Sequence, residues 1–344
     1  MEFLPKSMGT RPRLACEVRA EGVVAARAED SLAVLSAVSR VPLEGGAMVP
    51  HLRVSDTGVA AASVAVAANG FGEAGRAVLV AAVRKALEAV CLRSREVTLV
   101  VPDAAVRVLL LDFDALPAKP AEALPVVRFR LKKLLPFDAD EAAVSYQVMA
   151  STKDLLHVLA VAMPREVLAE CESVVREAGF EPGAVLPSTL AALAGLIDGD
   201  RPTLVVNAGQ EGVTTAIVKG GVLLLHRTVD LGADLQADLA AGMPGPEAAA
   251  KETGAEPTNE VAQAVSVAAA YFEDTLETAP SVILAAGTLG ADALTVLLDE
   301  AYVGPLAVQE MMDRQMLGAG ADSAGTPAGV PLGWLAGVRG ALAN

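Results

Sequence analysis

The sequence is poor in aromatic residues, cysteine and histidine, and each shortage narrows the possible functions. Only 3% of its 344 residues are aromatic although 53% are hydrophobic. The apolar content is therefore mainly Ala, Val and Leu, which suits an α/β protein better than a β-sandwich or a lectin. The three cysteines are far apart, so they form no metal or redox pair and indicate a reducing cytosol. The three histidines have no metal-binding spacing either.

Positive charge is also scarce, because 42 acidic residues oppose 27 basic ones and the formal net charge is −15. Such a chain has no overall field that would attract nucleic acid or anionic lipid. No apolar run approaches the ~20 residues that cross a bilayer, and Met1 to Pro5 lacks the pattern of a signal peptide. We expect no membrane span. The sequence also contains no Gly-x-Ser-x-Gly elbow and no P-loop.

Residues 202–235 hold the most informative pattern. An apolar strand runs into Asn207-Ala208-Gly209, and two further strands follow, separated by Lys219-Gly220-Gly221. Two strands around a short glycine-containing turn predict a β-hairpin. Gly209 would let the backbone approach a ligand closely, and Thr214 suits a half-buried strand. Asp234 is placed to cap a helix that follows the hairpin.

Two other segments share parts of this pattern. Residues 13–27 predict another hairpin, with Glu17 as its acidic residue and the bulky Arg19 close to the turn. Residues 281–290 predict a buried strand that ends in small residues at Gly287-Thr288 and continues into a helix. Such a strand end is a common ligand-binding edge in α/β folds.

The rest of the chain alternates helices and strands. The predicted helices are 73–93, 120–136, 165–178, 188–197, 234–242, 259–277, 291–300 and 332–343, and the predicted strands include 96–102, 106–113, 144–149, 155–162, 182–186 and 306–308. Helix 120–136 places Val127, Leu131, Leu134 and Leu135 on one face, with Arg128, Arg130, Lys132 and Lys133 around the rest. Those basic residues are compatible with a membrane-surface contact, but we favour a solvated face that offsets the acidic whole.

In this order, the segments resemble the PilM family of actin-like proteins of type IV pilus assembly. In that family a strand ending in Asp-Ile-Gly precedes a Thr-bearing strand, a glycine turn and an Arg-bearing strand, and here Asn207, Gly209, Thr214 and Arg227 take those places. The resemblance implies an α/β actin-like fold, a duplicated ribonuclease-H-like core with an inserted small αβ domain. We expect the first subdomain over 1–105 with a return over 187–200, the inserted domain over 106–186, and the second subdomain over 201–344.

The family's cofactors are ATP and Mg²⁺, and the resemblance implies where they would bind. The corresponding residues here are Glu17, Asn207, Gly209, Thr214, Lys251, Gly287 and Thr288. Two departures weaken this expectation. Asn207 stands where the family has a metal-facing Asp, and Arg19 stands where a glycine would bring backbone amides to phosphate. We therefore expect nucleotide binding to be weak or lost, no catalytic residue, and no metal ligand.

The resemblance also implies a function. We expect a cytoplasmic scaffold, peripheral at the inner membrane, that binds the cytoplasmic peptide of a PilN-like membrane protein. Other pilus-assembly proteins and further copies of the chain are additional expected partners, and nucleic acid is not. Two alternatives stay open: a working Mg-ATP-dependent actin-like ATPase, and a cytoplasmic component of a type II secretion system similar to GspL.

Overall fold

The computed structural model describes residues 12–29, 33–43, 73–196, 201–210, 212–231, 257–301, 303, 306–318 and 330–343. The strands are β1 Leu14–Arg19, β2 Gly22–Ala28, β3 Leu35–Pro42, β4 Glu96–Val101, β5 Arg107–Phe113, β6 Ala142–Ser151, β7 Leu156–Pro164, β8 Glu181–Pro187, β9 Thr203–Ala208, β10 Gly212–Lys219, β11 Val222–Asp230, β12 Val282–Gly287 and β13 Ala307–Glu310. The α-helices are α1 Glu73–Val90, α2 Pro120–Leu131, α3 Arg165–Glu177, α4 Ser188–Ala194, α6 Pro257–Leu276, α7 Gly290–Glu300 and α9 Leu335–Leu342. None of the helices in these ranges is long and apolar enough to span a bilayer.

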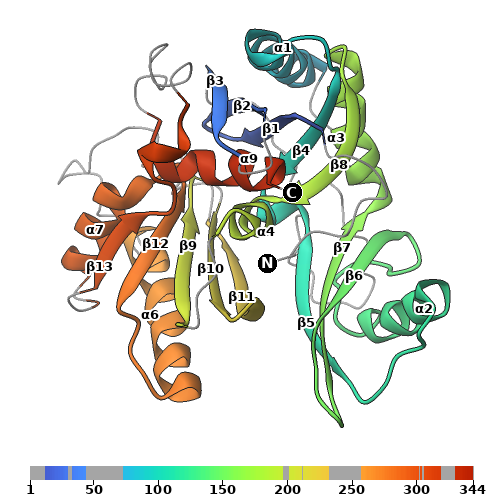
Figure 1. The fold of residues 1–344 in the computed structure, drawn as a ribbon, viewed down its shortest axis with the longest axis vertical. Coiled ribbons are helices and arrows are strands. Elements are labelled where there is room, and N and C mark those ends of the chain that lie inside the picture. Colours follow the sequence, from blue (N-terminus) through green and yellow to red (C-terminus); the bar gives the residue numbers. More distant parts are fainter. Residues whose placement is uncertain are drawn as a thin grey trace, which may run out of the picture.

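Two five-stranded sheets form the body of the molecule, and they have the same connectivity. Three strands of each form an antiparallel meander, β3-β2-β1 in the first and β11-β10-β9 in the second. After a helix, α1 or α6, a fourth strand returns parallel to the first strand of its half, and a fifth lies parallel to the fourth. Figure 1 shows the first sheet at the top and the second at the left. This repeat confirms the expected duplicated core.

The hairpin of β10 and β11 forms as its sequence pattern predicts. Gly220 and Gly221 in the turn have φ angles of 54° and 79°, which glycine adopts without steric cost and which match the twist of a two-residue hairpin. Val205 and Ile217 have no exposed surface, because α6 covers one face of the sheet while α4 and the small sheet cover the other. The predicted helix 234–242 lies outside the described residues.

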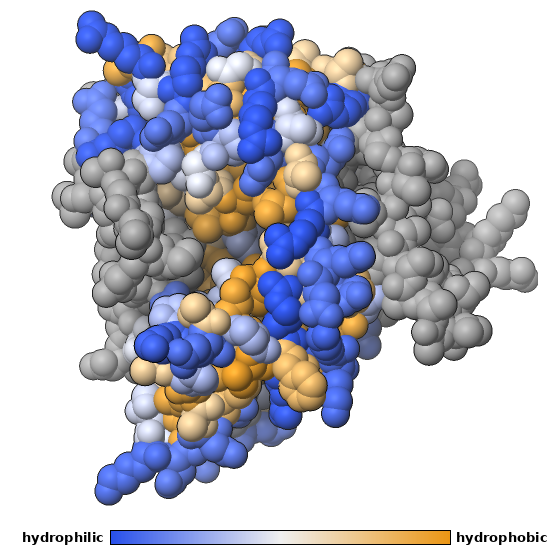
Figure 2. Space-filling view, turned by 90° about the vertical axis from the view of Figure 1, so that its right-hand side faces the viewer, coloured by the Kyte–Doolittle hydropathy of each residue, from blue (hydrophilic) through white to orange (hydrophobic). Residues whose placement is uncertain are grey.

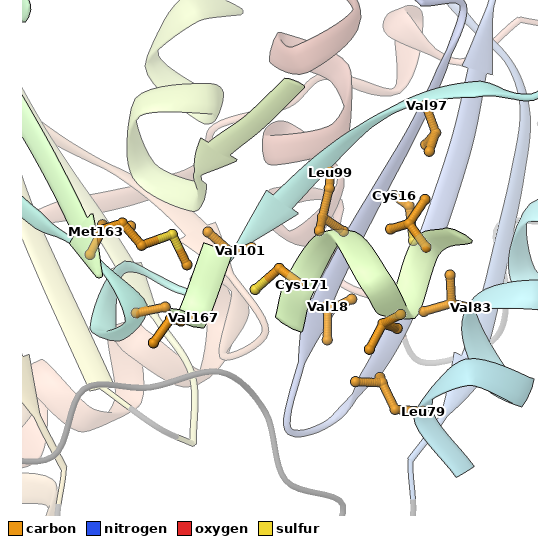
Figure 3. Close-up of a cluster of buried hydrophobic side chains, with 14 of the residues drawn as sticks. Cys16, Val18, Leu79, Val83, Val97, Leu99, Val101, Met163, Val167 and Cys171 are labelled. Carbon is orange, nitrogen blue, oxygen red and sulfur yellow. The ribbon is translucent and has the colours of Figure 1, made fainter. Parts of the chain in front are cut away.

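A large apolar cluster fills the first half of the molecule. Leu79 and Val83, one helical turn apart on α1, face the first sheet, where Leu99 lies on β4 (Figure 3). Val167 and Cys171 add the apolar side of α3. Burial raises the pKa of the Cys171 thiol to about 12, so this cysteine packs as a small apolar side chain.

A three-stranded sheet with the order β5-β7-β6 lies below the first sheet and beside the second, at the lower right of Figure 1, and carries α2. Val127 and Leu131 of α2 are fully buried and belong to the same apolar cluster as α1 and α3. On the other face, Leu110 and Val161 pack in a cluster with Leu223 of β11. The small sheet is therefore held by both halves.

Two segments lie in a different part of the fold from the one that the sequence predicts. The predicted inserted domain ends at residue 186 and includes β8, but β8 pairs in parallel with β4 and is an edge strand of the first large sheet. The predicted second subdomain runs to residue 344, but α9 packs on β1, β2 and β4 of the first half. The small sheet itself spans Arg107–Pro164. Both differences arise because pairing with partners distant in sequence decides where these elements lie.

Helix α2 is shorter than its sequence pattern predicts. It ends at Leu131, where the backbone amides of Leu134 and Leu135 both donate to the Leu131 carbonyl, at 2.9 and 3.0 Å. Pro136 disfavours helical backbone at its predecessor, and the chain leaves the helix one turn before that point. As a result Leu134 points outward with 49% of its surface exposed, and does not join the predicted apolar face.

Candidate functional site

The candidate site lies where the two halves of the core meet. Strand β1 carries Glu17 and Arg19 to this junction, and β9 carries Asn207. Since β12 runs parallel to β9 with Ala286 opposite Asn207, the end of β12 at Gly287 reaches the same edge. A cavity of about 30 Å³ remains between these elements, which is about the space of one water molecule.

Arg19 occupies the centre of the site and bridges the two halves. Its Nη2 donates to Asn207 Oδ1 at 2.8 Å and to Ser188 Oγ at 2.5 Å. Its Nε donates to Glu17 Oε1 at 2.7 Å. Only 9% of the residue is exposed. The guanidinium therefore lies inside the protein, where each of these hydrogen bonds is formed with little competition from water.

Asn207 fits this network better than an aspartate would. Its Nδ2 donates to Ser188 Oγ at 3.0 Å and to Thr189 Oγ1 at 2.9 Å, while its Oδ1 accepts from Arg19. Behind it, Asp103 Oδ2 accepts from Thr189 Oγ1 at 2.5 Å. An ionised aspartate could accept from Arg19 but could not donate to the two hydroxyls, and it would place a second negative charge beside Asp103. The amide at position 207 therefore serves contacts within the protein.

The charges of the site are almost completely removed from water. Glu17 has 0% of its surface exposed and Asp103 has 7%. Burial raises the pKa of Glu17, and the guanidinium of Arg19 offsets only part of that effect. For Arg19, burial alone would lower the pKa, but the carboxyl groups of Glu17, Glu21 and Asp103 outweigh it and raise the pKa. Arg19 therefore stays cationic and is the counter-charge for the buried acids.

Protein atoms already fill the space beside Gly209 and Gly287, and at Gly209 some of these atoms belong to the first half. A Cβ atom on Gly209 would lie 2.8 Å from Thr288 Oγ1 and 2.9 Å from Glu21 Oε1. A Cβ atom on Gly287 would lie 2.5 Å from Asn207 Oδ1. The hydroxyl of Thr288 donates to Glu21, so a side chain of the first half closes over the glycine turn of the second.

Most of the residues that the resemblance implies are together in the structure. Thr214 lines the cavity, and its hydroxyl forms a hydrogen bond of 3.0 Å with that of Thr228. Lys251 lies outside the described residues, as does the helix start at Gly232 and Asp234. The residues that meet directly at the junction are Glu17, Asn207, Gly209, Gly287 and Thr288.

Sequence reasoning misses four residues of the network, which are Glu21, Asp103, Ser188 and Thr189. A general rule points to three of them once the pairing of β4 with β8 is known. Asp103 follows β4, and Ser188 and Thr189 follow β8, and these two strands are parallel neighbours in the first sheet. The carboxyl ends of parallel strands meet at one edge, where α/β folds place polar sites. Glu21 gives no such signal, because it lies in a hairpin turn where acidic residues are usually solvated.

Comparison with known proteins identifies the fold. A scan against protein-family models finds no match, and a search of curated proteins finds none. Among solved structures, the chain is similar to one described as the PilM-PilN type IV pilus biogenesis complex, with a TM-score of 0.69 and 17% identity over 96% of this chain and 98% of that chain. The fold is actin-like.

Two other solved structures are similar to this actin-like chain at lower scores. One is the cytoplasmic domain of EpsL, an inner membrane component of the type II secretion system of Vibrio cholerae, with a TM-score of 0.44 and 13% identity over 86% of this chain and 96% of that chain. The other is the ethanolamine utilization protein EutJ from Carboxydothermus hydrogenoformans, with a TM-score of 0.43 and 11% identity over 96% of this chain and 89% of that chain.

The described residues at this junction do not fit Mg-ATP in the arrangement that the structure shows. Pockets that hold a drug-sized ligand measure ~300 to 1,000 Å³, whereas the cavity here is about 30 Å³. Arg19 fills the space between the hairpins, and Asn207 adds no negative charge for a divalent cation. The described residues also contain no group of three or more His, Cys, Asp or Glu side chains that could hold a metal ion.

Proposed function

We propose that this protein is a scaffold of a type IV pilus assembly machine that binds the cytoplasmic peptide of a PilN-like inner-membrane protein. The likeness of its fold, along nearly the whole chain, to a chain of the PilM-PilN complex supports this proposal most directly. Bound to such a partner, the protein is cytoplasmic and peripheral at the inner membrane. Other pilus-assembly proteins and further copies of the chain are its remaining proposed partners.

The filled cleft favours a scaffold over an ATPase. A working ATPase of this fold needs glycine-lined amides open to phosphate and a carboxylate that holds Mg²⁺ through water. Here Arg19 Nη2 donates a hydrogen bond of 2.8 Å to Asn207 Oδ1, and the carboxyl group of Glu21 packs against Gly209. A role in type II secretion similar to that of GspL is the second candidate.

The proposed peptide site is an apolar hollow on the face that carries α2 and α3. Figure 2 shows apolar surface gathered along the middle of this face, hollowed between hydrophilic upper and lower parts. Leu168 of α3, Leu135 after α2 and Tyr146 of β6 are half-buried at the margin of the large apolar cluster. A groove with apolar pockets suits an extended peptide, because alternate side chains of the peptide can enter it.

Binding of a partner peptide is the direct test of the scaffold proposal. In calorimetric titrations with synthetic cytoplasmic segments of inner-membrane proteins encoded beside this gene, we expect one segment to bind with a stoichiometry of one. Leu168→Glu should weaken that binding about tenfold or more, a loss of ~1.4 kcal/mol, since it places a charge in an apolar groove. Val296→Glu, on α7 in the second half with 55% of Val296 exposed, is the matched control and should leave binding unchanged. If none of the segments binds at any concentration, the scaffold proposal is wrong.

Titration with Mg-ATP tests the other part of the proposal. We expect little or no binding heat and no hydrolysis by the wild-type protein, because the guanidinium of Arg19 occupies the place of the phosphates. The double substitution Arg19→Gly and Asn207→Asp removes that group and supplies a carboxylate, so it should raise nucleotide affinity if the protein stays folded. Micromolar affinity with turnover in the wild-type protein would instead support the ATPase alternative.

A further inference from the structure

Helix α2 carries apolar side chains on two opposite faces, and only one of them packs inside the protein. Val127 and Leu131 face inward and are completely buried. Phe129 has 69% of its surface exposed, Val126 has 39%, and Leu134 in the following turn has 49%. A large exposed aromatic ring beside two exposed aliphatic side chains is unusual for a helix that only covers a sheet, because such residues are normally kept from water.

Two free cations lie on the same side. Arg130 follows Val126 at four residues, which places it on one helical face with Val126 and Phe129, and Lys133 lies in the turn that follows the helix. Both are exposed, and within the described part of the chain neither forms an ion pair. The neighbouring basic residues are engaged elsewhere: Lys132 pairs with Asp140 at 2.5 Å, and Arg128 donates to the backbone carbonyls of Ala139 and Ala142.

We propose that the outer face of α2 together with the turn that follows it, made of Val126, Phe129, Arg130, Lys133 and Leu134, contacts the anionic surface of a membrane. An aromatic ring and aliphatic side chains enter the boundary between headgroups and acyl chains, while arginine and lysine pair with anionic headgroups. Phe129 is exposed on the outside of α2. An exposed ring suits a deformable lipid surface, whereas a bound peptide needs a groove.

The acidic charge of the whole molecule does not prevent this contact. Although the net charge is −15, charges farther than ~8 Å apart are largely screened at physiological ionic strength. Anionic headgroups at the membrane surface therefore interact more strongly with Arg130 and Lys133 than with distant acidic residues. A contact of this size is weak and reversible, and stable attachment needs a second interaction. The proposed membrane contact does not use the residues of the peptide site, so the vesicle experiment and the peptide titration test the two proposals independently.

Sedimentation with vesicles tests the contact on the full chain. We expect the wild-type protein to co-sediment with vesicles of phosphatidylglycerol and phosphatidylethanolamine, less with phosphatidylcholine alone, and less as salt rises. The double substitution Arg130→Gln and Lys133→Gln should lower the partition coefficient about tenfold or more, and Phe129→Ser should lower it at every salt concentration. All these positions are exposed, so thermal unfolding should be unchanged and a loss of binding would not reflect misfolding.

The matched controls lie outside this face. Lys219→Gln removes an exposed cation at the end of β10 in the second half, and Val148→Ser removes an apolar side chain of β6 that is 43% exposed. Both variants should bind vesicles as the wild-type protein does. The membrane contact is refuted if wild-type protein stays in the supernatant at all lipid concentrations, or if the controls lose as much binding as the variants of the outer face. Capture of an acidic protein through Phe129 without vesicle binding would likewise refute it.

Discussion

Replacing Arg19 by alanine is expected to lower the free energy of unfolding by about 3–5 kcal/mol, the cost typical of removing one partner from a buried ion pair. The substitution leaves the carboxyl groups of Glu17 and Asp103 in a site where they are 0% and 7% exposed. It also removes the hydrogen bonds from the guanidinium to Glu17, Ser188 and Asn207. Denaturant unfolding followed by circular dichroism measures the loss.

An exposed ion pair is the matched control for Arg19. Arg176 pairs with Glu172 at 2.7 Å on the surface of α3, where the two side chains are 52% and 31% exposed. Arg176→Ala should cost no more than ~0.5 kcal/mol, because water replaces the lost contact. Adding Glu17→Gln to Arg19→Ala should recover part of the stability, since it removes one of the uncompensated acids. A loss below ~1 kcal/mol for Arg19→Ala would show that the network contributes little to stability.

Two side-chain contacts at the junction join the first half of the core to the second. Arg19 spans from β1 to Asn207 of β9, and Glu21 reaches Thr288 beyond β12. Each contact joins the first half to the second, and each uses a side chain where a phosphate site would need open space beside glycine. The positive charge that a metal ion would bring to the acids is supplied by a guanidinium that cannot be deprotonated in proteins.

Local sequence signals identified the parts of the fold that are set locally. The glycine turn at residues 220–221 and the hairpin of residues 13–27 depend on neighbours in sequence, and both were predicted at the observed positions. The approach of Asn207 to Gly287 was predicted only through the family resemblance, and the structure confirms it. Whether these residues bind a nucleotide remains a prediction.

Contacts between distant segments are the part that the sequence did not reveal. Strand β8 has the pattern of any short apolar strand, and only its pairing with β4 places it in the first sheet. In the sequence, Ser188 and Thr189 are typical of the start of a helix. Only the structure shows that they form hydrogen bonds with Asp103 and Asn207. Arg19 was noticed in the sequence, but its partners belong to three separate segments and could not be assigned without coordinates.

The second large effect is expected at Gly340, where α9 crosses α4. A Cβ atom at this position would overlap the backbone carbonyl oxygen of Ala191 and lie 2.9 Å from the amide nitrogen of Gly195. Because the obstacle is backbone, Gly340→Ala must force the two helices apart, and we expect a loss of about 3 kcal/mol or more in the free energy of unfolding. Helix α9 covers β1, which carries Glu17 and Arg19, so its displacement would also loosen the site.

A second helical glycine separates this steric effect from helix propensity. At Gly75 in α1 a Cβ atom would meet nothing within 4 Å, so Gly75→Ala should raise stability by about 0.5–1 kcal/mol. Unfolding in denaturant gives both values, and limited proteolysis of Gly340→Ala should cleave the chain ahead of α9 sooner than in the wild-type protein. Equal and small changes in the free energy of unfolding for the two substitutions would mean that the close packing of α9 does not stabilise the first half. Gly337 offers a second steric test, because a Cβ atom there would lie 2.6 Å from Glu17 Oε2.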